Sequence, residues 1–412
     1  MALDTYVEGA SSEHLESSLR YLVPKTSSAI IHSRQATVFA AGGAEYSSSQ
    51  GVRAITFRIQ GSGGATGGEF LDPSSLFFKA VCSKTESGDM AWKGPFWCCI
   101  QRVTVRLAST VVEDYTQFNR LYSMLRALFP TDEKTNALVA AGDKGSAVLA
   151  DAAPSGIFGF SMTPLALCRC GVLLPLSLIG ALEIVMELVP DAATFGDKAF
   201  KLTDVQMLCT IKQVDQEISS EIHSHTVGSG KSLPITLPGT YFCTDQVMTA
   251  DAVIHLSKSV SRATALFATY LDASSDEVVD FVRPTENTGT WELMVNSKRY
   301  PDRALGWDDT PAFYNSLKQT MGRETLDIDR DAFTSQSSNR QFIVAIDLTK
   351  SSADGVAGGE VSFTGENMRS SILSVQQKNC VLTGAASSQR IFLCLRYDSI
   401  IGISASGVDL LL

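Results

Sequence analysis

A glycine-rich segment is the first candidate for chemistry, as a phosphate-binding loop. GSGKS at 228–232 resembles the end of such a loop, which needs a glycine five places before the glycine of the Gly-Lys pair and a helix directly afterwards. His225 stands where that glycine belongs, and LPITLP follows, which predicts a strand. We therefore expect a Gly/Ser loop here and no nucleotide site.

Three aspartates have the spacing of the first ligands in a calcium loop. Asp327, Asp329 and Asp331 match these positions, but Ala332 replaces the glycine that the sharp turn needs and Ser338 replaces the closing glutamate. This pattern excludes an EF-hand. It leaves open a weak surface cation site, for which a solvated turn is the simpler alternative.

Two short pairs could each supply two metal ligands. His223 and His225 form one pair and Cys168 and Cys170 the other. Structural zinc takes four ligands, usually in two pairs of matched spacing, and these pairs are too distant in sequence to follow such a pattern. We expect loop histidines and half-buried thiols instead.

Candidates for nucleophilic or acid–base catalysis are equally weak. GFSMT at 159–163 and GISAS at 402–406 both lack the last glycine of GxSxG. Glu183 and Glu187 lie at even spacing on a predicted strand, so we expect them on one solvated or interface face. The five histidines are His14, His32, His223, His225 and His255. His32 and His255 fall in strand patterns and are expected to be packing residues. The sequence predicts no catalytic, cofactor or metal residue and no enzyme.

The composition points to a globular protein with large contact surfaces. The chain has 412 residues, enough for two domains, and 44% are hydrophobic. Only 19% are charged, below the usual level of about 25%, as expected where much surface is hidden between subunits. The net charge is −10, and no cluster of Lys and Arg is present. Direct, charge-driven or sequence-specific binding to nucleic acid is therefore not expected.

The cysteines and apolar runs indicate neither a secreted nor a membrane protein. Nine cysteines cannot all pair internally, and most lie in apolar stretches, as free buried thiols do. The first residues lack the pattern of a signal peptide. The longest apolar run, 172–189, is broken by Pro175 and Gly180 and contains Glu183 and Glu187, which argues against a spanning helix.

Most of the chain predicts short β-strands, because runs rich in Val, Ile, Thr and Phe alternate with Gly, Ser and Asp. Val103, Val105 and Leu107 face one way, opposite to Thr104 and Arg106, which is typical of half-buried antiparallel strands. The predicted strands are 28–40, 52–59, 75–83, 96–107, 156–161, 171–176, 179–189, 200–214, 233–243, 252–257, 264–271, 290–299, 340–349, 371–377 and 390–404.

Helical spacing is confined to a few segments. Residues 113–129 and 310–321 each follow a long predicted strand, and FNRLYSML in the first resembles FYNSLKQTM in the second. This hints at one β unit used twice. Asp309 or Thr310 can cap the second helix, with Pro311 at its first position. Residues 11–23 predict a short amphipathic helix carrying Leu15, Leu19 and Leu22.

The order of these pieces resembles the double jelly-roll major capsid proteins of polinton-like viruses, adintoviruses and virophages. The resemblance rests on GGEFLDPSSLFFKAV (67–81), RVTVRLASTVVEDYTQFNRLYSML (102–125), SGIFGF (155–160), LLPLSLIGALEIVMELVPDAATF (173–195) and AFKLTDVQMLCTIKQVD (199–215). In that family a Glu-Asp-Tyr block follows a strand of the first barrel, and the last of these segments opens the second barrel. The match covers roughly residues 50–325, and the chain is short for the class.

The resemblance implies a mainly β fold of two tandem eight-stranded antiparallel jelly-roll sandwiches with a few short helices. We expect an N-terminal arm with a short amphipathic helix at 1–26, a first jelly roll at 27–195 and a second at 196–412. It also implies a homotrimer that forms pseudo-hexagonal capsomers in the icosahedral virion of a double-stranded DNA virus. The implied partners are neighbouring capsomers, penton proteins and minor capsid proteins. The acidic balance fits a shell filled by a motor or one enclosing an inner membrane, and both remain open.

Two other functions fit paired β-sandwiches. A two-domain carbohydrate-binding or adhesion protein could stack sugars on Trp92, Trp97, Trp291 or Trp307, although Trp97 and Trp291 lie in strand patterns that predict core positions. A bicupin-type enzyme would need two histidines and a carboxylate near a Gly-rich turn in each half. The five scattered histidines do not supply them.

Overall fold

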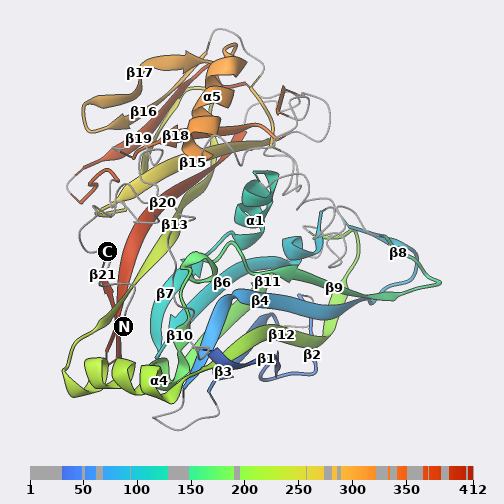
Figure 1. Cartoon of the computed structure of the whole chain (residues 1–412). Coiled ribbons are helices and arrows are strands. Elements are labelled where there is room, and N and C mark those ends of the chain that lie inside the picture. Colours follow the sequence, from blue (N-terminus) through green and yellow to red (C-terminus); the bar gives the residue numbers. More distant parts are fainter. Residues whose placement is uncertain are drawn as a thin grey trace, which may run out of the picture.

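The computed structural model describes residues 30–48, 52–61, 68–92, 94–128, 148–189, 195–256, 258–272, 281–284, 289–321, 333–334, 341–349, 365–369, 371–381, 389–404 and 407–411. This part of the chain forms two β-sandwiches, the first below the second in the view of Figure 1. Two long strands of the second sandwich run down beside the first.

The first sandwich is built from two antiparallel sheets. One contains β1 (Ile30–Phe39), β2 (Glu45–Tyr46), β4 (Glu69–Lys84), β9 (Ser155–Ser161), β10 (Leu174–Pro175) and β12 (Phe200–Val214). The other contains β3 (Ala54–Gln60), β6 (Ile100–Leu107), β7 (Thr110–Tyr115) and β11 (Ala181–Leu188). The first sheet has the order β1-β12-β4, with β9 and β10 both on β4 and β2 on β12, and the second has the order β3-β11-β6-β7.

The second sandwich also has two antiparallel sheets. One contains β13 (Leu233–Met248), β15 (Ala263–Asp272), β18 (Ile343–Asp347), β20 (Gln389–Ser404) and β21 (Gly407–Leu411). The other contains β14 (Ala252–Leu256), β16 (Thr290–Val295), β17 (Lys298–Gly306) and β19 (Leu373–Lys378). Their orders are β13-β20-β15-β18, with β21 on β20, and β14-β19-β16-β17.

Both sandwiches have the same topology. If the eight main strands of each are counted along the chain, one sheet has the order 1-8-3-6 and the other 2-7-4-5 in both halves. This is the order of an eight-stranded jelly roll. The prediction of a β unit used twice is therefore confirmed, and so is the predicted fold class.

The two longest helices occupy equivalent places in the two units. Helix α1 (Phe118–Ala127) follows β7, and α5 (Thr310–Met321) follows β17. The side chain of Asp309 caps α5 by accepting the N–H of Ala312 at 3.0 Å. The predicted helix at 113–129 begins later than expected, because residues up to Tyr115 pair with β6 in β7.

Shorter elements connect these parts. They are β5 (Met90–Ala91), the 3₁₀ turn η3 (Phe96–Cys99), β8 (Val148–Leu149), the 3₁₀ turn η5 (Leu167–Arg169), α3 (Leu176–Ile179), α4 (Gln216–His223) and the π turn η7 (Ser224–Gly228). The segment 96–99, predicted as strand, is therefore helical. Helix α4 lies at the lower end of the molecule in Figure 1 and joins the two sandwiches.

The expected boundary between the two jelly rolls at 195/196 is wrong. Strand β12 was assigned to the second unit, but it pairs with β4 and β1 of the first. The change from one sandwich to the other therefore falls between Val214 and Leu233, where α4 lies. The predicted arm at 1–26 lies outside the described residues.

Each sandwich has an aromatic core. In the first, Phe78 lies 5.1 Å from Phe160 and 6.0 Å from Phe96, measured between ring centroids. In the second, Trp307 stacks on Phe313 of α5 with a centroid distance of 5.6 Å. Such rings bury large apolar areas and fix their neighbours by offset or edge contacts. In the first sandwich, Phe57 of β3 meets Phe78 of β4 edge-on at a centroid distance of 6.1 Å and so links the two sheets.

Candidate functional site

The structure separates the residues that the sequence offered for chemistry. Gly228 ends the π turn and Leu233 begins β13, so the GSGKS segment leads into a strand and cannot present a helix N-terminus to a phosphate. His223 and His225 belong to the helical segment at the lower end, whereas Cys168 lies in η5. No three His, Cys, Asp or Glu side chains of the described residues cluster as a metal site. The three aspartates at 327, 329 and 331 lie outside the described residues.

The serine, histidine and tryptophan candidates also lie apart. Ser161 ends β9, and Ser404 in β20 donates its hydroxyl to the carbonyl oxygen of Gly407 at 3.1 Å. His32 and His255 are exposed on β1 and β14, so the expectation that they are packing residues is wrong. The tryptophans Trp92, Trp97, Trp291 and Trp307 are all buried, which leaves none of them as a platform for a sugar.

The described cysteines form no disulfides and are mostly buried. Eight described cysteines are free, and seven of them are buried. Burial raises the pKa of Cys82 to about 12, so its thiol stays protonated at neutral pH.

The helices of the described part of the chain are all too short or too polar to traverse a bilayer.

Glu183 and Glu187 belong to a charged ladder on the outer face of the sheet β3-β11-β6-β7. Arg106 approaches Glu183 at 3.4 Å, and Arg102 approaches Glu187 at 3.6 Å. Arg102 also donates two hydrogen bonds of 2.8 Å to the carboxylate of Asp114 on β7. The prediction of a solvated face is confirmed, because each carboxylate pairs with an arginine and remains partly exposed.

The opposite outer face of the first sandwich carries several apolar side chains among polar ones. Side chains of β1, β12, β4 and β9 alternate between the core and this face, as the burial pattern of β12 shows. Phe39 and Ile157 are 64% and 65% exposed there. We call this surface the apolar outer face; its apolar members are Phe39, Phe77, Val81, Ile157 and Leu208.

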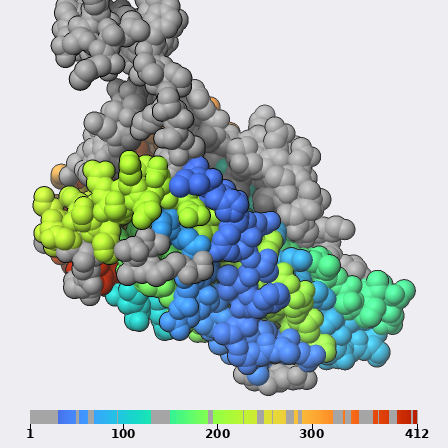
Figure 2. Space-filling model, turned by 60° about the horizontal axis from the view of Figure 1, so that its bottom comes forward, coloured from blue at the N-terminus to red at the C-terminus, as the bar shows by residue number. Residues whose placement is uncertain are grey.

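The strand register brings the members of the apolar outer face together. Leu208 lies opposite Phe77, and Ile157 opposite Val81. A Cβ at Gly159 would collide with the ring of Phe77, which shows that this ring lies across the glycine. Figure 2 shows the face at the surface, with β1 in dark blue beside β12 in yellow-green and β4 in lighter blue.

Polar groups surround this face. Lys212 pairs with Asp72 at 2.7 Å, and Lys201 pairs with Glu45 at 2.8 Å. Lys79 also lies on this face, between its apolar side chains. Apolar side chains interspersed with polar ones are typical of non-obligate protein–protein interfaces. The apolar outer face is therefore the best candidate in the described chain for contact with another protein surface.

A second candidate site lies in the seam between the two sandwiches. Arg169 of η5 donates to the carbonyl oxygen of Pro238 on β13 at 3.0 Å and to the hydroxyl of Thr240 at 3.3 Å. Further along the seam, the hydroxyl of Thr110 on β7 donates to the carbonyl oxygen of Val408 on β21 at 3.2 Å. These bonds fix the angle between the two units.

A buried carboxylate organises the side of the seam that belongs to the first sandwich. Glu113 accepts the hydroxyl of Tyr115 at 2.5 Å and the backbone N–H groups of Ala166 and Leu167, each at 2.7 Å. Burial raises the pKa of Glu113, while these hydrogen bonds and the charge of Arg169 oppose the rise. The carboxylate thereby holds the η5 turn in the position from which Arg169 crosses the seam.

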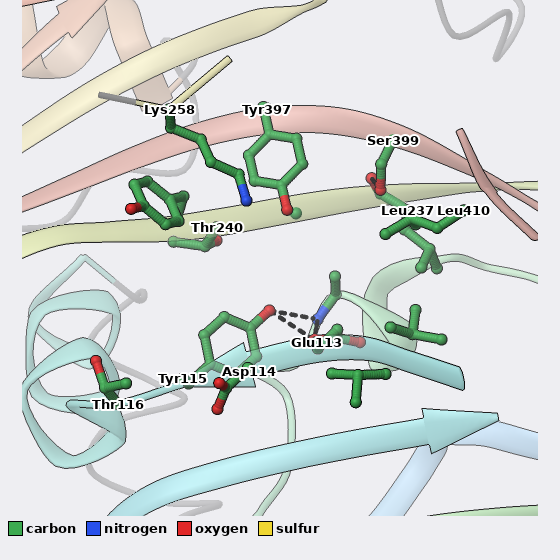
Figure 3. A pocket seen from close by; sticks show the side chains of 15 residues that line it. Glu113, Asp114, Tyr115, Thr116, Leu237, Thr240, Lys258, Tyr397, Ser399 and Leu410 are labelled. Atoms are coloured by element: carbon green, nitrogen blue, oxygen red, sulfur yellow. Dashed lines mark hydrogen bonds between the residues drawn. The ribbon is translucent and has the colours of Figure 1, made fainter. Parts of the chain in front are cut away.

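The seam encloses a cavity of about 350 Å³. Lys258 and Tyr397 point into it from the second sandwich, and Glu113 and Tyr115 from the first (Figure 3). Burial raises the pKa of Tyr397 to about 12, so its phenol stays protonated. The described lining contains no thiol and no imidazole, and Glu113 is already saturated with hydrogen bonds. This arrangement can hold two units together, but it offers no nucleophile with a base.

Sequence reasoning missed both the seam and the apolar outer face. The sequence contains a signal for the outer face and one for Glu113. Segment 75–83 has apolar residues at odd and even positions, which indicates a strand covered on both faces. Glu113 follows apolar Val112 and stands two residues before Tyr115. The spacing of this segment predicts the start of a helix. No sequence signal marked Arg169.

The comparisons with known proteins concern the fold. No protein-family model matches the chain, and no relative is found among curated proteins. The VP54 chain of PBCV-1, from a crystal structure fitted into a reconstruction of the virophage Sputnik, is similar with a TM-score of 0.60 and 10% identity, over 95% of this chain and 98% of that one.

Two further solved structures give the same picture. A chain from the cryo-EM structure of the Sputnik virophage gives a TM-score of 0.59 at 10% identity, over 96% of this chain and 92% of that one. The Faustovirus major capsid protein gives 0.58 at 7% identity, over 93% and 92%. This chain therefore shares its fold with these proteins along nearly its whole length.

Proposed function

We propose that this chain, which has the double jelly-roll fold, is a viral major capsid protein. In this proposal it trimerises into pseudo-hexagonal capsomers and tiles the icosahedral shell of a double-stranded DNA virus, with penton and minor capsid proteins as further partners. The observation that carries the proposal is the tandem of two jelly rolls with identical strand order, shared almost end to end with VP54 and the Faustovirus major capsid protein.

The tandem supports a tile of six units from three chains. Because each chain contributes two sandwiches of the same topology, a threefold trimer presents six similar units around its axis. The seam bonds of Arg169 support this geometry, since a tile needs a fixed angle between its two units. The role of a tile needs only the structural contacts that the described seam residues make.

The apolar outer face supports self-association. Phe39 and Ile157 leave most of their side chains in contact with solvent in the single chain. Exposed apolar clusters of this kind are costly in water and mark contact sites. In the assembled tile we expect this face to lie against a neighbouring copy.

The decisive experiment examines the purified chain by analytical ultracentrifugation and negative-stain microscopy. We expect trimers as wide as six packed barrels, or closed shells. The double variant Phe39→Asp/Ile157→Asp should weaken association at least tenfold, since it places a charge on each outer strand of the apolar outer face, β1 and β9. The control Val253→Asp changes an exposed apolar residue of the second sandwich and should assemble normally. A wild-type chain that stays monomeric at high concentration contradicts the proposal, whereas an unaffected double variant rejects only this face.

A second experiment concerns the N-terminal segment, which lies outside the described residues. Its sequence places Leu15, Leu19 and Leu22 on one side of a predicted helix. We propose that it ties neighbouring tiles together on the inner face. Deletion of residues 1–23 should leave trimers intact and impair shell closure. Normal particles from the truncated chain contradict this role.

A further inference from the structure

The seam inside the chain joins opposite ends of the two sandwiches. On the first sandwich it is formed by β7 and the η5 turn, and on the second by β13 and β21. Among the eight main strands of each sandwich, β7 is the fifth and β13 is the first. The first and second strands meet at one end of a sandwich, as the bridge between Ala41 and Thr56 shows, and the fifth strand lies at the far end of the sheet that contains the second. The seam therefore joins the fifth-strand end of one unit to the first-strand end of the other.

Both strands of the seam are covered where they meet. Val112 and Tyr115 of β7 are buried, and so are Leu237 and Thr240 of β13. All four line the cavity between the sandwiches, and the hydroxyl of Thr240 also accepts a hydrogen bond from Arg169. Each sandwich thus covers an edge strand of the other, which would otherwise stay open to solvent.

The two equivalent strands have no such cover. β1 is the first strand of the first sandwich, and none of its residues is buried; Ile31 is 62% exposed. β17 is the fifth strand of the second sandwich, and none of its residues is buried either. A strand of a sandwich ordinarily buries one face against the other sheet, so exposure along the whole strand marks an open edge. The single chain therefore closes one seam and leaves both halves of a second one open.

One chain cannot join these two halves by itself. Figure 1 shows β17 at the upper end of the molecule and β1 near the lower end, on different sandwiches. A second copy is therefore needed to bring a β1 strand to β17. Because such a contact joins two different surfaces, it is heterologous, and heterologous contacts form rings when the rotation between copies closes.

We propose that β17 of one copy lies against β1 of the next, which repeats between chains the seam found inside each chain. This inference rests on the proposed capsomer function and names the surface that each copy offers to its neighbour. Phe39 belongs both to β1 and to the apolar outer face, so the contact is continuous with the face assigned above to a neighbouring copy. With two sandwiches per chain, three copies joined in this way close a ring of six units.

The exposed side chains of the two strands suit each other. β1 presents Ile31 and Phe39 to solvent, whereas β17 presents Lys298 and Arg303. The long aliphatic stems of lysine and arginine can cover apolar side chains while their charged ends stay in water. The contact thus covers the apolar residues of β1 without burying an unpaired charge.

The test replaces Arg303 of the full chain with the photo-cross-linking residue p-benzoylphenylalanine. Trimers are assembled from this variant and isotope-labelled wild type, so that mass spectrometry recognises adducts between copies. We expect adducts with peptides that contain β1, about tenfold or more above the control, since only the heterologous contact brings β1 to β17. The control carries the same residue at His255, an exposed position of β14 at the opposite end of the same sheet. The reciprocal variant, with the cross-linker at Thr37 of β1, should form adducts with β17.

The outcomes separate this inference from the proposed function. Trimers in which the Arg303 variant links β17 to β17 or to the charged ladder, or in which neither variant forms an adduct between copies, overturn the inference and leave the capsomer in place. A wild-type chain that stays monomeric overturns both. Melting temperatures equal to that of wild type show that the variants are folded, and the reciprocal variant decides the question if the Arg303 variant does not fold.

Discussion

Glu113 keeps a carboxylate inside the protein, and three donors surround it. Tyr115, Ala166 and Leu167 each donate a hydrogen bond to it, and two of these donors are backbone groups that cannot move away. Removing the acceptor leaves buried N–H groups without a partner, which costs more than the bond contributes. The residue therefore matters through the η5 turn that it holds.

The first prediction is that Glu113→Gln destabilises the protein by about 2 kcal/mol, because the amide puts an NH2 donor where one of the two carboxyl oxygens faces the donors Tyr115, Ala166 and Leu167. Thermal or urea unfolding measures this loss. Glu183→Gln, on the solvated charged ladder, is the matched control and should change the free energy of unfolding by less than about 0.5 kcal/mol. Equal effects of the two substitutions would contradict the structural role of Glu113.

The loss of stability in Glu113→Gln should depend on pH, in a direction set by the pKa of Glu113. Burial raises the pKa of Glu113, so the folded state keeps its proton at pH values where the unfolded chain has lost it. The stability that this proton contributes is complete below the ordinary glutamate pKa of about 4.3 and is lost as the pH rises through the folded pKa. The difference between wild type and Glu113→Gln should therefore shrink as the pH rises above the ordinary glutamate pKa of about 4.3. A difference that grows as the pH rises would contradict the raised pKa.

Asp114, the next residue, should behave in the opposite way. Hydrogen bonds from Arg102 lower its pKa, so its contribution is present above the ordinary aspartate pKa of about 3.9 and is lost as the pH falls through the lower folded pKa. Both side chains of this pair are more than a third exposed. Asp114→Asn should therefore cost less than about 1 kcal/mol at pH 7, and this cost should shrink as the pH falls below about 3.9, measured by urea unfolding. A cost that does not change as the pH falls contradicts the ion pair as its source.

At the scale of elements, the sequence predicts strands well where one face is buried. Strand β12 has the predicted bounds, because its side chains alternate between core and surface along its length. Strand β17 was mostly missed, since its sequence KRYPDRALG is polar on both faces and leaves no periodicity. Strand β7 was taken for helix because Tyr115 precedes Phe118 by three residues, a spacing that fits both structures.

The side-chain cap of helix α5 allows a prediction about stability. Asp309 accepts the N–H of Ala312 and so satisfies one of the unpaired donors at the start of the helix. Asp309→Ala should lower the free energy of unfolding by about 1 kcal/mol. Asp309→Ser, which can cap in the same way, should restore most of it. Asp302→Ala, at an exposed position of β17, serves as the control in the same unfolding assay.

At the scale of the whole molecule, the sequence predicted two jelly rolls but misplaced their boundary. Strand β12 completes the first sandwich by pairing with β4, which lies far earlier in the chain. Local patterns record which face of a strand is buried but not which strand lies beside it. For the same reason the seam could not be predicted, because Arg169 and its acceptor Pro238 meet only after both units have folded.

The last prediction concerns the coupling of the two units. Arg169→Ala removes the bonds to Pro238 and Thr240, so the sandwiches should move more independently. We expect faster hydrogen exchange at 164–170 and 235–241, while exchange in β11 and β16 stays unchanged.

The control for this variant is Arg34→Ala, which breaks only an exposed ion pair with Glu69 at the edge of the first sandwich. It should leave exchange at the seam as in wild type, because surface pairs contribute little. Since a six-unit tile requires a fixed angle between the two sandwiches of each chain, Arg169→Ala should also produce irregular trimers in negative stain. Regular trimers together with unchanged exchange in both seam segments would show that the cavity-lining contacts of β7 and β13, and not Arg169, set this angle.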